Sequence, residues 1–226
     1  IDGMALAYRG HFAMIRDPRM TAKSVNTSAV YVFTNVLADL MLSHDPTHLA
    51  VVFDTPEPTH RHKAYREYKA TRDAMPEDLQ IALPYIDRLC AALNVPVLRY
   101  PGWEADDVVG ALSRIAEEDG YETYMITPDK DYAQLVDTHT FFCKPSKGGS
   151  FDILGISEVC DEWGVERPDQ VIDILGLMGD SSDNIPGVPG IGRKTAQKLI
   201  AAYGSVEGVY MHLDELEGKQ RENLET

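Results

Sequence analysis

Short apolar runs alternate with longer amphipathic segments over the first two thirds of the chain, and this alternation constrains the fold most strongly. Runs 47–54, 95–100, 121–127 and 138–144 have the length and composition of buried strands. Segments 30–41, 78–94, 103–118 and 130–136 have the pattern of helices, and Gly148 with Gly149 marks a turn. Strands that alternate with helices predict an α/β fold with a parallel-type central sheet.

The pattern changes after about residue 157, beyond which we expect no further strands. Segments 167–179 and 192–204 predict two helices that each end at a glycine. We therefore predict an α/β core over residues 1–156 and a helical lobe over residues 157–226. The lobe contains a predicted helix–hairpin–helix at about 171–204.

The charge of the chain argues against a general nucleic-acid binder. It has 36 acidic and 21 basic residues and a formal net charge of -15, whereas such binders are expected to be basic. Its 44% apolar content is typical of a soluble globular protein, and no apolar run is long enough to cross a bilayer. No secretory signal is visible, and three separated cysteines without a metal or redox motif favour reduced thiols in the cytoplasm: Cys90, Cys143 and Cys160.

Acidic residues follow the predicted strands or begin the next helix. Ligands of open parallel sheets bind beyond the carboxyl ends of the strands, so we expect these acids to converge on one edge. Their mutual repulsion favours neutralisation by Mg²⁺ or Mn²⁺. A solvated surface acid or a helix N-cap is the alternative for any one of them, and Asp106 and Asp107 suit a helix dipole. The acids are Asp2, Asp54, Glu104, Asp106, Asp107, Asp129 and Asp131.

A basic insertion at about 56–78 separates the strand that ends at Asp54 from the next helix. As a helix, it would place Tyr65, Lys69 and Arg72 on one face. Cations with interleaved aromatic rings are the elements of a single-strand grip, and a solvated amphipathic helix is the alternative. Its other basic and aromatic residues are Arg61, Lys63, Arg66 and Tyr68.

The stretch "GVPGIG" predicts a tight hairpin between the two helices of the lobe. Gly187, Gly190 and Gly192 let backbone N–H groups approach a phosphate, and Lys194 and Lys198 lie one turn apart on the following helix. A turn without a ligand is the alternative. Two further acids, Asp180 and Asp183, stand directly before this hairpin.

These stretches together resemble the 5′-nuclease family, which includes the 5′→3′ exonuclease domain of bacterial DNA polymerase I and the flap endonucleases. The resemblance covers essentially the whole chain, in the order of the family. It rests on "DGMALAYR", "VVFD", "THRHKAYREYKATR", "GWEADDVVG", "TPDKD", "GDSSDNIPGVPGIGRKTA" and "YGSVEGV".

The resemblance implies metal-dependent hydrolysis of DNA near a 5′ flap or 5′ end, leaving a 5′-phosphate and a 3′-hydroxyl. It assigns two or more Mg²⁺ or Mn²⁺ ions to the seven strand-end acids together with Asp180 and Asp183. It places Lys69 and Arg72 as catalytic cations in a helical arch, with Tyr68, Arg9 and Arg61 near the DNA. It also implies duplex binding by the hairpin, with K⁺, and a role beside or fused to a DNA polymerase in Okazaki-fragment processing and repair.

One departure concerns Asp2, because only one residue precedes it where the family has more of the first strand. We therefore expect a loosened Asp2. Two other functions stay open on the residues alone. A Mg²⁺-dependent small-molecule phosphatase would share the strand-end acids but would not need the hairpin or the insertion. A DNA-binding module without catalysis would not need the full set of acids.

Overall fold

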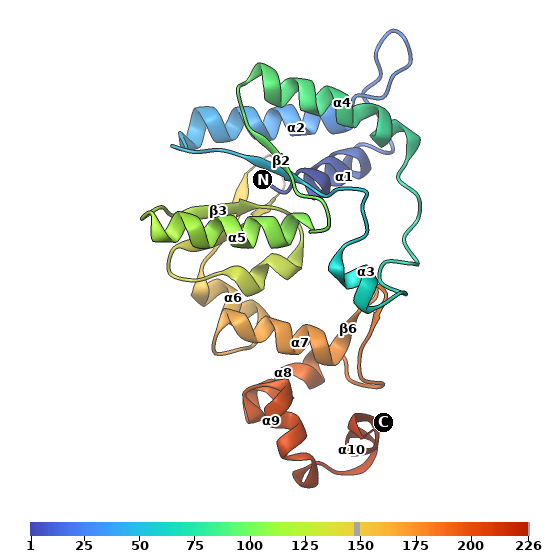
Figure 1. Ribbon diagram of the computed structural model, residues 1–226, viewed down its shortest axis with the longest axis vertical. Helices are drawn as coiled ribbons and strands as arrows, with labels where there is room; N and C mark the ends of the chain where they lie inside the picture. Colours follow the sequence, from blue (N-terminus) through green and yellow to red (C-terminus); the bar gives the residue numbers. More distant parts are fainter. Residues whose placement is uncertain (147–149, 226) are drawn as a thin grey trace. The chain divides into compact units, whose positions relative to one another are not determined.

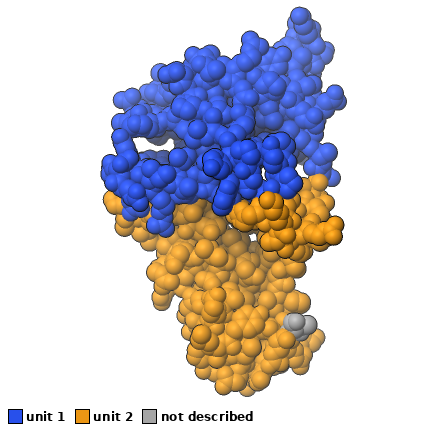
Figure 2. All heavy atoms as spheres, viewed as in Figure 1, with its two compact units in different colours: residues 1–59, 73–129, 142–153 blue, residues 60–72, 130–141, 154–226 orange. Residues whose placement is uncertain are grey.

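The computed structural model describes residues 1–146 and 150–225. They divide into two compact units, coloured separately in Figure 2. Unit 1 comprises residues 1–59, 73–129 and 142–153, and unit 2 comprises residues 60–72, 130–141 and 154–226. Residues 60–72 of the basic insertion therefore belong to unit 2, and the predicted domain boundary after residue 156 stays a prediction.

The first two residues of the chain lie between two strands of unit 1. Val52 donates its backbone N–H to the Ile1 carbonyl at 2.8 Å, and Asp2 donates its own to the Ile126 carbonyl at 3.0 Å. Strands β1 and β2 pair in parallel, and a second sheet has the order β3–β4–β5. This arrangement confirms the predicted parallel-type sheet. The strands are β1 (Val51–Phe53), β2 (Val97–Arg99), β3 (Thr123–Ile126), β4 (Thr140–Pro145) and β5 (Phe151–Leu154).

Helices of unit 1 bury one apolar face each, and α2 lies beside α4 (Figure 1). Helix α2 buries Phe33, Val36 and Leu37, which share a face at helical spacing. A Cβ atom at Gly3 would lie 2.6 Å from the Phe53 ring, so glycine lets α1 begin close to β1. The helices are α1 (Gly3–Ala13), α2 (Ser28–Asp39), which continues as a π-helical turn (Leu40–His44), α4 (Glu77–Ala92) and α5 (Ala105–Glu118).

Unit 2 has its own core, which includes the fully buried Trp163, Ile174 and Leu177. Helices α7 and α8 pack together, and each ends at a glycine as predicted. Nowhere in residues 1–146 and 150–225 is a helix long and apolar enough to cross a bilayer. The helices are α3 (His60–Ala64), α6 (Ile156–Trp163), α7 (Val171–Met178), α8 (Arg193–Tyr203), α9 (Val206–Met211) and α10 (Gly218–Leu224), with 3₁₀ turns at Lys130–Leu135, Pro168–Gln170 and Leu213–Glu215.

The expectation that strands end by residue 157 is wrong. Strands β6 (Gly179–Asp180) and β7 (Ile185–Pro186) form a short antiparallel pair. The backbones are so close that a Cβ atom at Gly179, whose φ is +72°, would lie 2.2 Å from the Gly187 nitrogen. Two-residue strands carry no apolar periodicity, so the pattern of the sequence does not reveal them. The predicted turn at residues 148–149 lies outside the described residues.

The expectation of a helix through residues 65–72 is also wrong. Helix α3 ends at Ala64, turns follow it, and Lys69 has a left-handed φ of +57°. The spacing of the cations shows which residues would share a face if the segment were a helix. Its backbone conformation depends instead on polar contacts with residues 182–184.

Candidate active site

Asp2 is fixed firmly in unit 1, although the sequence predicts that it is loose. Its carboxylate caps α1 by accepting the Ala5 N–H at 2.9 Å, and it accepts the Thr127 hydroxyl at 3.0 Å. Only 6% of Asp2 is exposed. Burial raises the pKa of Asp2, and the charges of Asp54 and Asp129 raise it further, while both hydrogen bonds oppose the shift. Asp2 therefore lies within electrostatic range of two other predicted ligands, and burial and charge both act against its ionised form.

The buried Thr127 connects two of these acids. Its hydroxyl donates to Asp2 and accepts the backbone N–H of Asp129 at 3.1 Å. Asp129 follows β3, as predicted for an acid at the carboxyl end of a strand. Thr127 was not among the predicted site residues, although it stands directly between the apolar run and "PDKD".

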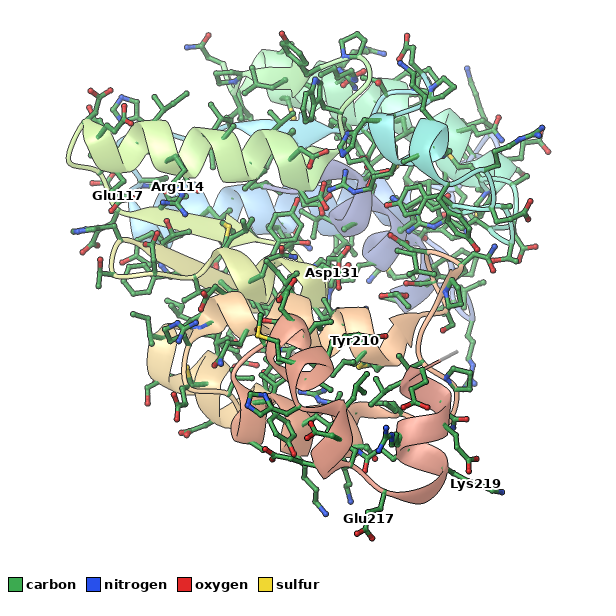
Figure 3. All side chains as sticks on the ribbon, turned by 60° about the horizontal axis from the view of Figure 1, so that its bottom comes forward. Arg114, Glu117, Asp131, Tyr210, Glu217 and Lys219 are labelled. Carbon is green, nitrogen blue, oxygen red and sulfur yellow. The ribbon has the colours of Figure 1, made fainter. Side chains whose placement is uncertain are left out.

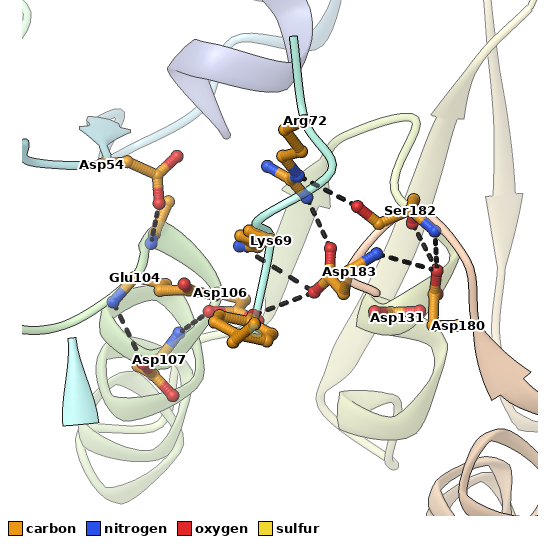
Figure 4. Close-up of polar contacts among 12 residues, drawn as sticks. Asp54, Lys69, Arg72, Glu104, Asp106, Asp107, Asp131, Asp180, Ser182 and Asp183 are labelled. Carbon is orange, nitrogen blue, oxygen red and sulfur yellow. Dashed lines mark hydrogen bonds and ion pairs between the residues drawn. The ribbon is translucent and has the colours of Figure 1, made fainter. Parts of the chain in front are cut away.

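Four acids gather at the start of α5. Asp54, just after β1, accepts the Ala105 N–H at 2.9 Å (Figure 4). Glu104 caps the helix and is 6% exposed, and its N–H donates to Asp107 at 3.0 Å. Asp106 accepts the Asp107 N–H at 2.7 Å. The first turn of a helix carries a partial positive charge, which stabilises these carboxylates.

In unit 2, Lys130 lies between two predicted ligands. Its ammonium binds Asp131 at 3.2 Å and forms a short contact with Asp180. Asp180 also accepts the Ser182 N–H at 2.7 Å. Burial alone would raise the pKa of Asp180, but hydrogen bonds from Lys130 and Ser182 outweigh it and lower this pKa to about 2. Lys130 was also missed, although "DKD" places it between two acids.

Asp183 is bound by side chains of the basic insertion. Arg72 binds one carboxylate oxygen at 2.5 Å (Figure 4). The Tyr68 hydroxyl donates to the other at 2.9 Å. The Lys69 ammonium lies 3.9 Å from the oxygen that Tyr68 binds. The two predicted catalytic cations therefore meet at one acid, which itself is a predicted metal ligand.

Tyr68 does not offer its ring for base stacking in this conformation. It is 4% exposed, its ring contacts the imidazole of His62, and its hydroxyl is bound to Asp183. The alternation of cations and aromatic residues in the sequence does not indicate which aromatic rings are buried and which are exposed. Tyr65, at 38% exposure, is the more accessible ring.

The three glycines of the hairpin have different structural roles. A Cβ atom at Gly187 would lie 2.2 Å from the Met178 backbone, so this glycine serves close packing. Gly190 has a φ of +75°, and Gly192 precedes α8 with open space where a Cβ atom would be. The start of α8 is thus accessible to a ligand at Gly192, which suits a backbone grip on phosphate.

The remaining predicted DNA-binding residues lie on both units. Lys194 and Lys198 are exposed on α8, as the spacing predicts. Arg61 lies in α3, and Arg9 in α1 donates to the Ser146 carbonyl at 3.3 Å. Figure 3 shows Lys219 on α10, where it adds a cation to unit 2.

Metal binding would require side chains to move. Among the described residues, no three His, Cys, Asp or Glu side chains are grouped closely enough to hold an ion. The donors are nevertheless oxygen-rich, as Mg²⁺ and Mn²⁺ require, and Asp2 is close enough to Asp54 and Asp129 for their charges to add to the effect of burial in raising its pKa. The acids of unit 1 therefore fit a hard divalent cation, whereas Asp180 and Asp183 would first exchange their bound Lys130 and Arg72.

Comparison with known proteins gives two family matches that together span nearly all of the chain. Residues 1–164 match the 5'-3' exonuclease N-terminal resolvase-like domain, and residues 166–226 match the 5'-3' exonuclease C-terminal SAM fold. DNA polymerase I of Bacillus caldotenax is 40% identical over 222 residues, which are 97% of this chain and 25% of that protein. The chain spans about a quarter of the length of the curated relatives it matches.

Two solved structures from bacteriophage T5 share the fold. The T5 5'-exonuclease with bound zinc is 23% identical, with a TM-score of 0.80 over 99% of this chain and 82% of the other. The T5 D15 flap endonuclease in complex with DNA and metal ions is also 23% identical, with a TM-score of 0.77 over 99% of this chain and 81% of the other.

Proposed function

Because the chain belongs to the 5'-3' exonuclease family, we propose that it cuts DNA phosphodiesters near a 5′ flap or a 5′ end of a duplex. The products would carry a 5′-phosphate and a 3′-hydroxyl. One observation carries this proposal: Asp183, a candidate ligand, binds both Lys69 and Arg72, so acids suited to a metal and cations suited to a phosphate share one place in unit 2.

The acids would hold divalent cations, Mg²⁺ or Mn²⁺. One set is on unit 1, and Asp131, Asp180 and Asp183 are on unit 2. Such ions lower the pKa of a bound water and offset charge on the phosphate. The unit 1 ligands would be Asp2, Asp54, Glu104, Asp106, Asp107 and Asp129. Bound zinc in the T5 5'-exonuclease supports a divalent cation, and the choice of Mg²⁺ or Mn²⁺ rests on the oxygen donors.

Lys69 and Arg72 would stabilise the charge of the phosphate during cleavage. Fixed cations are most effective where negative charge develops. In the described conformation both are bound to Asp183, so they are close to the acids before any substrate arrives. Arg9 and Arg61 would contact the DNA backbone elsewhere.

The hairpin would hold duplex DNA away from the cut. Backbone N–H groups at Gly190 and Gly192 would bind a phosphate at the start of α8, with Lys194 and Lys198 beside it. K⁺ would occupy the hairpin carbonyls. This grip reads the backbone and not the sequence, as a flap-processing enzyme requires. A role with a DNA polymerase in Okazaki-fragment processing and repair, in the bacterial cytoplasm, follows from the likeness to DNA polymerase I.

A 5′-flap duplex labelled at its 5′ end tests the proposal. The chain should release short labelled products in Mg²⁺ and none in EDTA, while Ca²⁺ should allow binding with little turnover. Asp129→Asn, which removes one carboxylate charge next to Thr127, is the matched inactive control. Mg²⁺-dependent release of phosphate from a small monoester without flap cleavage would favour a phosphatase. Binding without cleavage under every condition would favour a non-catalytic module.

A further inference from the structure

The basic segment 66–72 is bound to the loop 182–184 at several points, all within unit 2. Lys69 donates its backbone N–H to the Asp183 carbonyl at 2.9 Å. Arg72 donates its Nε to the Ser182 carbonyl at 3.1 Å, and the Asn184 amide donates to the Glu67 carbonyl at 2.6 Å. The segment therefore has a defined conformation although it forms no helix.

The side chain of Asp183 is the center of these contacts. It binds the Arg72 guanidinium, the Tyr68 hydroxyl and the Lys69 ammonium, and it is only 14% exposed. Hydrogen bonds to a charged group are stronger than neutral ones, and partial burial protects them from solvent. The nearby Asp180 is bound instead by Lys130, which lies outside the segment.

The backbone of the segment is strained where Asp183 holds it. Lys69 has a φ of +57°, a conformation that is unfavourable for a residue with a Cβ atom. Such a conformation persists only where the surrounding contacts determine it. The contacts of Asp183 on both sides of Lys69, at Tyr68 and Arg72, supply that determination.

We propose that Asp183 is a positioning residue that holds segment 66–72 in its turn conformation and so keeps Lys69 and Arg72 together at one acid. This inference does not depend on nuclease activity.

Hydrogen exchange of the backbone amides in residues 66–72 tests the proposal on the whole chain. Without metal, Asp183→Asn should speed exchange of Lys69, Ala70 and Arg72 by at least about tenfold, the effect of losing one hydrogen bond to a charged group. Asp161→Asn is the matched control, since it removes an equal charge from an exposed position of α6 in unit 2, and none of the contacts of Asp183 described above involves α6. Equal loosening by both variants, or none by Asp183→Asn, would overturn the positioning role.

Two further measurements protect the test against general unfolding. Tyr68→Phe removes one hydroxyl from the opposite side while it keeps the buried ring, and it should speed exchange in the same residues by a smaller factor. Asp183→Glu, which keeps the carboxylate, should restore part of the protection that Asp183→Asn loses. Unchanged exchange in Tyr68→Phe would contradict the contact, and no recovery in Asp183→Glu would contradict the need for charge.

Discussion

The candidate acids of the two units are held in opposite ways. In unit 1, neutral donors bind Asp2 and Asp54: backbone N–H groups and the hydroxyl of Thr127. In unit 2, the protein's own cations Lys130 and Arg72 bind Asp180 and Asp183. Asp2 and Asp54 are thus held by neutral groups, whereas Asp180 and Asp183 are each bound to a cation of the protein.

The candidate metal ligands of this chain therefore do not share one electrostatic environment. Burial raises the pKa of Asp2, and neighbouring carboxylates raise it further, whereas hydrogen bonds from Lys130 and Ser182 lower the pKa of Asp180 to about 2. A cation entering unit 1 relieves repulsion, but a cation entering unit 2 displaces an ammonium or a guanidinium. The two sets should therefore respond differently to mutation.

The largest effect is expected from Asp54→Asn. It removes the charge of Asp54 but keeps an oxygen that accepts the Ala105 N–H. Single-turnover cleavage of a flap duplex in Mg²⁺ should fall by about 10³-fold, as for the loss of a main electrostatic group. Asp119→Asn, at the far end of α5, is the control. Near-normal cleavage by Asp54→Asn would remove this acid from the ligands.

Lys69→Ala tests the role of a cation that is bound to the acids of unit 2. Single-turnover cleavage should slow by roughly 10²-fold, because the charge of the phosphate loses a fixed cation. Duplex affinity should change much less. Lys63→Ala, in the neighbouring α3, loses the same charge without a contact to Asp183 and should cleave normally. Equal rates for the two variants would place Lys69 among solvated surface cations.

Lys194→Glu separates DNA binding from chemistry within unit 2. It should weaken duplex binding by roughly tenfold and reduce the slope of log affinity against log salt by about one for the lost phosphate contact. Cleavage at saturating DNA should stay nearly normal. Arg88→Glu is the same charge reversal at an exposed position of α4, and it should leave the salt slope unchanged. Identical slopes for both variants would argue that the hairpin only connects two helices.

The smallest effects concern stability without metal, where the two units should differ in sign. Asp2→Asn removes a buried charge and should raise the melting temperature by about 2–4 °C, while Asp180→Asn loses the Lys130 bond and should lower it by a similar amount. Shifts of the same sign would remove the contrast between the units. Melting in EDTA is the measurement.

The pH dependence of these shifts follows from the two pKa directions. The folded pKa of Asp2 is raised, so its ionised form destabilises the fold at neutral pH, and the benefit of Asp2→Asn should shrink as pH falls through that pKa towards 3.8. Asp180 has a lowered pKa, so its contribution is present above pH 3.8 and is lost as pH falls to about 2. Melting temperatures between pH 7 and pH 2 check both signs.

Much of the fold was predictable from the sequence because local patterns determine it. Apolar runs gave β1 to β4, and apolar periodicity gave α2, α4 and α5 near their observed positions. Strand β5, the pair β6–β7 and the course of residues 65–72 were not predictable in this way. Short strands and irregular turns depend on partners distant in the sequence, such as Gly187 for Gly179.

The order of residues was enough to predict which acids follow strands or begin helices. It was also enough to predict that Lys194 and Lys198 share a face of α8. Residue type and periodicity are local properties, so a single chain displays them. Three features became visible only in the folded chain. Tyr68 is buried, Thr127 donates to Asp2, and Asp183 binds Arg72 from 111 positions away in the sequence. Charge pairing depends on distance in space, and that distance exists only after the chain has folded.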